Sequence, residues 1–408
     1  MSTSELYHMQ GSVGFTQIGR VSYHKNQIHY SLIAQPKMIR CPCCGSTNVV
    51  TRGSVDRKFQ GVPLETKKFI FLNVKVPKVE CKKCRIIRQI NVGFADTKKR
   101  YTKSFANEAV KLMMGTSIEN AAKRLMISWH TANSILQSYI KKKYAKNRFK
   151  NVKRIGIDET YIGKTKRFIT IVVNLDTGEV IFVGLGKGED ALIPFWELLG
   201  NRKKRIEAVA IDMGAAFQKA VRDNIPQAIM VFDHFHVVKL MNDRIDRLRR
   251  SVFRNATDDE KDVIRGSRYL LLKNHENLDD FRHEKERLDR LLQLNTPLTT
   301  GYVMKESLKQ IWWQVNYKDA KNCLEGWIAQ ANASFIGELM MMARTLARFS
   351  EGILNYYRYN ITTASLEGLN TKIKAMIRRA YGFRNMNNFI RMILAIKEFN
   401  PLTLLAPG

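Results

Sequence analysis

The sequence lacks any apolar segment that could cross a membrane. A bilayer-spanning helix needs about 20 consecutive apolar residues, and no stretch of the 408 residues comes near that. The first ten residues also lack the charged segment followed by an apolar one that a secretory signal would show. We therefore expect a cytoplasmic protein with no membrane partner.

Acidic residues are scarce. The chain has 37 Asp and Glu against 68 Lys and Arg, a formal net charge of +31. Such an excess favours a polyanionic partner, because each Lys or Arg that meets a phosphate releases counterions. Residues 1–150 alone hold 28 Lys and Arg against 7 Asp and Glu. We expect nucleic acid as the partner, bound mainly by this first third. Composition alone leaves open a basic surface that serves solubility, ribosomal RNA or an acidic membrane.

Cysteine is also rare, and five of the six cysteines lie within residues 41–84. Two C-x-x-C pairs stand there, and each pair can form a turn that points two thiolates at one Zn²⁺. In a reducing compartment this spacing favours a metal, with disulfides as the alternative. The sequence predicts a zinc ribbon with a structural Zn²⁺ on Cys41, Cys44, Cys81 and Cys84.

The segment from Ser117 to Leu136 has the pattern of a helix-turn-helix. Two adjacent alanines allow close helix approach, and Ser128 is placed to cap a second helix. That helix would enter a major groove with Trp129, His130 and Asn133. A plain pair of packed helices gives the same pattern and remains the alternative.

After residue 151 the periodicity predicts an α/β domain with the order β-β-β-α-β-α-β. The expected strands cover residues 152–157, 168–175, 180–185, 208–211 and 228–232, and the expected helices cover residues 190–199 and 215–222. From residue 236 to about 359 only helical patterns occur.

Three acidic residues carry the predicted chemistry. Asp158 and Asp212 each end an apolar strand, and Glu367 begins a helix. Each residue alone is commonly a turn residue or a favourable charge at a helix start. The predicted strand order makes the two strand tips neighbours, and three carboxylates so placed would hold hard cations. Mg²⁺ is preferred, as a two-metal site, and Mn²⁺ is the alternative.

Further residues are expected around these carboxylates. Asp233 and His236 follow a strand and are candidates to support the metal ligands. Lys374 and Arg378 share a helix face with Glu367 and could hold a DNA backbone, although a merely solvated basic face fits the same spacing. Glu159 should point to the opposite face of its strand from Asp158.

Several segments together resemble one family. They are Ile155–Glu159, Ile211–Met213, Phe232–Lys239, Leu366–Lys374 and Arg379–Arg384. These segments are similar to the zinc-ribbon insertion-sequence transposases of the ISL type, found in bacteria, which belong to the broader DDE group. The resemblance implies that Asp158, Asp212 and Glu367 form the acidic triad, and that the four paired cysteines hold zinc.

The resemblance also implies a domain order. Residues 1–40, which have no predicted role, come first. They are followed by a zinc ribbon at 41–95, a helix-turn-helix at 100–146, and an RNase H-like catalytic domain at 151–408 with a helical insertion at about 240–355. The expected protein is a nucleoid-associated transposase. It would act on double-stranded DNA as a homo-oligomer, binding terminal inverted repeats, cutting there and joining ends to target DNA. A DNA-binding regulator with a degenerate core is the main alternative, and a nuclease that cuts without joining is a lesser one.

Overall fold

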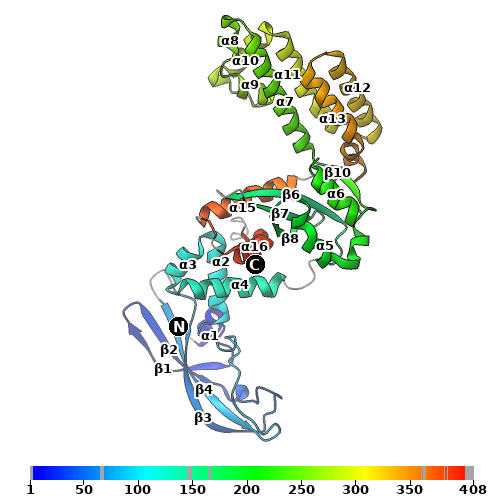
Figure 1. The fold of residues 1–408 in the computed structure, drawn as a ribbon. Helices are drawn as coiled ribbons and strands as arrows, with labels where there is room; N and C mark the ends of the chain where they lie inside the picture. Colours follow the sequence, from blue (N-terminus) through cyan, green and yellow to red (C-terminus); the bar gives the residue numbers. More distant parts are fainter. Residues whose placement is uncertain are drawn as a thin grey trace. The chain divides into compact units, whose positions relative to one another are not determined.

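The computed structural model describes residues 3–64, 69–144, 149–163, 167–359, 361, 364–380, 382–383 and 385–399. The chain divides into two compact units (Figure 1). Unit 1 contains residues 1–146 and 378–408, and unit 2 contains residues 147–377. Within the described residues, the structure has no helix whose length and apolar character would let it span a bilayer.

Unit 1 contains a mixed sheet with the strand order β1-β2-β4-β3, and β5 pairs with β4. The elements in this part of the chain are α1 (Thr3–Gln10), β1 (Phe15–His24), β2 (Gln27–Ala34), η1 (Pro36–Met38), β3 (Val49–Gln60), β4 (Phe69–Cys81) and β5 (Ile87–Gln89). Along β4 alternate residues such as Leu72, Val74 and Val76 are buried, as expected where one sheet face covers a core. Residues 1–40, which show no clear period, thus supply two strands to the same sheet as the cysteine-bearing segment.

Three short helices follow this sheet. They are α2 (Lys103–Gly115), α3 (Ile118–Leu125) and α4 (Trp129–Tyr144). Ser117 caps α3 by accepting from the Asn120 amide at 3.1 Å, and Ser128 accepts from the Thr131 amide at 3.1 Å. The turn between α3 and α4 contains Met126 in the left-handed conformation. The expected pair of helices joined by a short turn is therefore present.

The end of the chain packs on these helices. The predicted catalytic domain covers residues 151–408, and within it residues from Arg378 onward cluster with unit 1. The reason is the contact of α16 (Met386–Leu394), which is followed by η7 (Ile396–Phe399), with α4. Phe389 is buried, and Asn388 Nδ2 donates to Asn133 Oδ1 at 3.3 Å.

Unit 2 is built on a five-stranded sheet with the order β10-β9-β6-β7-β8. Neighbouring strands among β6, β7 and β8 are antiparallel, and β9 and β10 run parallel to β6. The elements are β6 (Arg154–Gly163), β7 (Arg167–Asn174), β8 (Glu179–Leu185), η2 (Asp190–Leu192), α5 (Ile193–Leu199), η3 (Gly200–Arg205), β9 (Ala208–Ile211), α6 (Ala215–Asn224) and β10 (Ile229–Phe232). The predicted order β-β-β-α-β-α-β is confirmed, and it is the topology of an RNase H-like core.

A helical insertion leaves the sheet after β10 and returns beside it. Its main elements are α7 (His234–Asn255), α8 (Asp258–Ile264), α9 (Arg268–Leu272), η4 (His275–Asn277), η5 (Asp280–Arg282), α10 (Glu284–Leu294), α11 (Thr296–Leu308), η6 (Lys309–Trp313), α12 (Tyr317–Ala333), α13 (Gly337–Leu354) and α14 (Tyr356–Tyr359). Helices α7 and α13 lie side by side (Figure 1). Asn355 Nδ2 donates to the Met230 carbonyl at 3.0 Å, which fixes the returning end to β10.

The last helix of unit 2, α15 (Ala364–Arg379), packs closely on β6. Leu366 is buried, and a Cβ atom at Gly156 would lie only 2.7 Å from Leu366 Cδ1. Glycine at position 156 therefore lets the start of α15 approach the centre of the sheet. This contact determines where the following residue, Glu367, stands.

Candidate active site

Five acidic residues from four separate segments of the sequence line one pocket of about 190 Å³ in unit 2. The pocket lies between β6, the ends of β9 and β10, and the starts of α7 and α15. Its lining residues are Ile157, Asp158, Glu159, Ile211, Asp212, Asp233, Phe235, His236, Lys239, Leu366, Glu367, Asn370 and Lys374. The pocket thus brings together Asp158, Asp212, Glu367, Asp233, His236 and Lys374 from the predicted set.

Asp158 lies within β6 and not at its end. We expected the strand to stop at residue 157, but β6 continues to Gly163 through its pairing with β7. Pairing with β9 covers only Arg154 to Gly156, so the β9-facing edge of β6 is open from residue 157 onward. Asp158 reaches the pocket because of this open edge.

Two donors hold the Asp158 carboxylate. The Glu159 amide donates to Oδ1 at 2.7 Å, and Asn370 Nδ2 donates to Oδ2 at 2.6 Å. Burial raises the pKa of Asp158, and the negative charge of Asp212 adds to this increase, whereas these hydrogen bonds oppose it. The pocket therefore places a carboxylate where an uncompensated negative charge is costly.

Asp212 follows β9 directly, as expected, and its carboxylate accepts from the Gly214 amide at 3.0 Å. A Cβ atom at residue 214 would lie 2.9 Å from Asp212 Oδ1. The tight turn after β9 therefore requires a residue without a side chain at position 214 to keep this carboxylate in place.

Glu367 lies in the first turn of α15 and is exposed toward the pocket, with Lys374 two turns further along the same helix. Asn370 lies between them and was not among the predicted site residues. It joins α15 to β6, since Thr160 Oγ1 donates to its side-chain oxygen while its amide holds Asp158. The spacing that identified Lys374 would also have identified Asn370, which is three residues after Glu367.

Asp233 caps α7 by accepting from the Phe235 amide at 3.0 Å. His236 lies one turn along, with Nε2 3.8 Å from Asp233 Oδ2. Both residues border the pocket, as does Lys239, which sequence reasoning did not single out as a site residue. The helical spacing of Asp233, His236 and Lys239 puts them on one face of α7.

The position of the Glu159 side chain differs from the expectation. The alternation of a strand was expected to point it away from Asp158, yet it borders the same pocket. Its carboxylate accepts from the Gly188 amide at 2.7 Å. Burial raises its pKa, and Asp212 is among the charges that raise it further. At the open edge of β6 the alternation of the strand does not keep this long side chain clear of the pocket.

In unit 1 the four predicted cysteines converge. The ligand atoms of Cys41, Cys44, Cys81 and Cys84 all lie within 4.8 Å of one another. The Sγ atoms of Cys44 and Cys81 are 3.6 Å apart. Four thiolates at this separation fit a tetrahedral Zn²⁺. Among the described residues, the pocket carboxylates do not show an equally close convergence of ligand atoms.

The other residues predicted to contact DNA differ in their exposure. Trp129 is 42% exposed and His130 is exposed at the start of α4, whereas Asn133 is half-buried against α16. Arg378 is exposed on α15 but does not line the pocket.

The chain is similar to known proteins over most of its length. The family model of the ISL3 transposases, described as "Transposase", matches residues 155–393. A second model, the zinc-finger of transposase IS204/IS1001/IS1096/IS1165, matches residues 37–84. The chain is 30% identical to the transposase for insertion sequence element IS1001 of Bordetella parapertussis, over 88% of this chain and 89% of that protein.

Two more distant similarities were found. The transposase for insertion sequence element IS1557 of Mycobacterium tuberculosis is 25% identical over 87% of this chain and 85% of that protein. Among solved structures, the Drosophila P element transposase strand transfer complex aligns with a TM-score of 0.41 and 9% identity. That alignment covers 76% of this chain and 94% of the matched chain.

Proposed function

The chain belongs to the ISL3 family of transposases, and from this membership we propose that the carboxylate pocket of unit 2 is where it cuts and joins DNA. One observation carries the proposal. Asp158, Asp212 and Glu367 come from distant parts of the sequence and line a single pocket. We assign these three residues as the catalytic acids of a DDE transposase.

The donor set of the pocket fits divalent metal ions, which DDE transposases use. Its three assigned acids offer only carboxylate oxygens, the ligands that hard cations prefer. A bound cation would also relieve the cost of the buried Asp158 charge beside Asp212. We propose that these acids hold Mg²⁺, with Mn²⁺ as an alternative. When bound, a pair of such ions activates the attacking oxygen and stabilises the leaving one.

The remaining pocket residues have separate roles in this proposal. Asn370 orients the Asp158 carboxylate through its amide. Lys239 and Lys374 present positive charges at the pocket and bind phosphate oxygens of the DNA strand. Asp233 fixes the start of α7 as its cap and thereby positions His236.

In this proposal unit 1 recognises the terminal inverted repeats of the DNA. Zn²⁺ on the four cysteines stabilises the cysteine-bearing end of the sheet and takes no part in the chemistry. Helix α4 enters a major groove of the terminal inverted repeats with Trp129 and His130, and Asn133 is oriented for this by α16. Arg378 contacts the backbone. The protein acts as a homo-oligomer on the element ends and target DNA.

The location of the metal can be tested without an activity assay. Fe²⁺ in place of Mg²⁺, with ascorbate and peroxide, generates radicals that cut the polypeptide close to the bound ion. We expect cuts near Asp158, Asp212 and Glu367, mapped by mass spectrometry, that excess Mg²⁺ suppresses and that Asp212→Asn removes. Asp223→Asn, an exposed carboxylate on α6, is the matched control. Cuts confined to the cysteine cluster, or unchanged in Asp212→Asn, would show that this pocket does not hold the metal.

A further inference from the structure

Helix α7 carries a basic stripe that begins at the pocket. From Lys239 onward, the exposed charged residues of α7 are Lys239, Asp243, Arg247, Arg250 and Arg254. Their spacings of three and four residues place them along one face of the helix. Four of the five are basic, although the insertion as a whole contains many acidic residues. The positive charge is therefore concentrated on this face.

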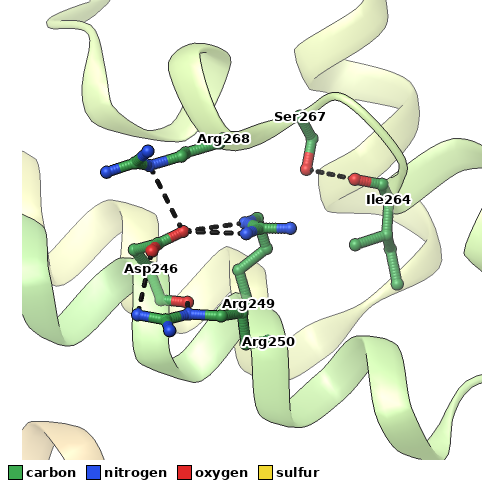
Figure 2. A network of polar contacts seen from close by, with 6 residues as sticks. All are labelled: Asp246, Arg249, Arg250, Ile264, Ser267 and Arg268. Atoms are coloured by element: carbon green, nitrogen blue, oxygen red, sulfur yellow. Dashed lines mark hydrogen bonds and ion pairs between the residues drawn. The ribbon is translucent and has the colours of Figure 1, made fainter.

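The middle of the stripe is joined to a polar network (Figure 2). Arg249 Nη2 lies 2.9 Å and Arg250 Nη2 3.1 Å from oxygens of the Asp246 carboxylate, and Arg268 Nε lies 3.6 Å from it. Arg250 also donates from Nε to the Asp246 carbonyl at 3.3 Å. Three guanidinium groups thus surround one carboxylate, which leaves the cluster positively charged.

The network holds its arginines in place. The Asp246 side chain is only 11% exposed, whereas those of Arg250 and Arg268 are 57% and 52% exposed. Burial alone would raise the pKa of Asp246, but the hydrogen bonds and charges of the arginines outweigh it and hold the pKa below its ordinary value. Each guanidinium has five N–H donors, and the contacts to Asp246 engage only some of them. Two exposed guanidinium groups therefore retain donors for an outside anion.

The start of α9 is fixed as well. Ser267 Oγ donates to the Ile264 carbonyl at 2.7 Å, directly before Arg268 (Figure 2). Arg268 therefore extends from an ordered turn toward α7. Preorganised arginines suit phosphate, because the planar guanidinium matches two phosphate oxygens at once.

We propose that the α7 stripe and the Asp246 cluster form a second DNA-binding surface, which binds backbone phosphates of the duplex whose end lies in the pocket. The proposal rests on the proposed function of that pocket. Lys239 and Arg250 lie on the same helix face about 16 Å apart along the axis, which corresponds to about five base pairs of DNA. With α7 lying along the duplex, the Asp246 cluster contacts the DNA about half a helical turn from the phosphate at Lys239.

The test compares two double variants of the full-length protein. Arg250→Gln with Arg268→Gln removes two proposed phosphate contacts. The control is Arg287→Gln with Arg290→Gln, which removes two exposed arginines of α10 and changes the net charge equally. The probe is a fluorescent DNA duplex that contains one terminal repeat of the element, and its affinity is measured over a range of salt concentrations. The slope of log affinity against log salt should fall by about two in the first variant, at about 0.9 per phosphate, and stay unchanged in the control.

A structural role would give a different result. If the cluster only joins α7 to α9, the first variant lowers the melting temperature and leaves the salt slope unchanged. Arg254→Gln, on the stripe but outside the network, should lower the slope by about one without loss of stability. Equal slopes for wild type, Arg254→Gln and the first variant overturn the proposal. The slope does not depend on cleavage, so failure of the assigned triad would be seen separately, in the reaction.

Discussion

At the scale of single residues, Asn370 connects α15 to the Asp158 carboxylate on β6. Its amide holds Asp158, and its side-chain oxygen accepts from Thr160. Asp158 and Asp212 could be predicted because each follows a short apolar run, and a carboxylate at that point is conspicuous. An amide in the middle of a polar helix face is not conspicuous. The helical spacing from Glu367 includes Asn370, but its bond to Asp158 depends on the contact between α15 and β6, which the sequence does not reveal.

We predict that Asn370→Ala weakens metal use more than DNA binding. Residues that orient metal ligands typically contribute about 10- to 100-fold to metal affinity or activity. Cleavage by the variant should need a correspondingly higher Mg²⁺ concentration for half-maximal rate, while its affinity for repeat DNA stays the same. Asn322→Ala, which removes an exposed amide on α12, is the matched control. An unchanged Mg²⁺ requirement in Asn370→Ala would contradict the positioning role.

The helical insertion contains an ion pair, Lys273 with Glu284, that makes its stability depend on pH. Glu284 is buried, and Lys273 Nζ lies 2.6 Å from Oε2 while the Asp279 amide donates to the same oxygen at 2.9 Å. The hydrogen bond from Lys273, with that of the Asp279 amide, holds the pKa of Glu284 below its ordinary value. A carboxyl group whose pKa is lower in the folded than in the unfolded state stabilises the fold at a pH above the unfolded-state pKa. This stabilisation is lost as the pH falls through the folded-state pKa.

Glu284→Gln should therefore lower the melting temperature of the insertion at neutral pH, because it leaves Lys273 without its partner. The difference from wild type should shrink as the pH is lowered through the acidic range. Calorimetry over a series of pH values measures this. Glu286→Gln, an exposed carboxylate on the same helix, should have little effect at any pH. A difference that grows toward acidic pH would mean that the carboxylate does not stabilise the fold as an anion.

At the scale of elements, the sequence predicted which helices and strands exist better than where they end. The order of unit 2 is as expected, yet β6 continues six residues beyond the predicted end of its strand, because β7 pairs with it as far as Gly163. Strand ends depend on the neighbouring strand, which a local pattern does not include. The contact of Gly156 with Leu366 shows the same limit, since both residues are unremarkable in the sequence.

Because of this contact, position 156 should not tolerate a side chain. Gly156→Ala places a methyl group against Leu366 and Leu175, and overpacking of this kind costs about 1–3 kcal/mol. We expect α15 to be displaced, and cleavage to fall because Glu367 moves with it. Leu366→Ala should partly restore cleavage in the Gly156→Ala protein while reducing it in the wild type. Strictly additive losses in this cycle would mean that the two residues do not act through one contact.

At the scale of the whole molecule, the sequence predicted the order of the domains along the chain. It did not predict that α16, near the end of the chain, packs on α4. The zinc-ligand set and the basic first third could be recognised locally, because both are properties of continuous sequence. The packing of α16 on α4 joins residues more than 200 positions apart, for example through Arg391 and Gln137. No periodicity or composition within either segment indicates that partner. The same reason explains why residues 1–40 could not be assigned to the sheet.

We propose the pocket formed by β6, β9, α7 and α15 as the catalytic site of this transposase. The most direct test is cleavage and joining of labelled DNA that carries the terminal repeats, in the presence of Mg²⁺. Asp158→Asn, Asp212→Asn and Glu367→Gln should each reduce product formation at least about a thousandfold, equivalent to roughly 4 kcal/mol of barrier. Repeat binding should be retained, and Asp223→Asn should cut and join as the wild type does. Cleavage that persists in the Asp158 or Asp212 variant at near wild-type rate would mean that this pocket is not the catalytic site.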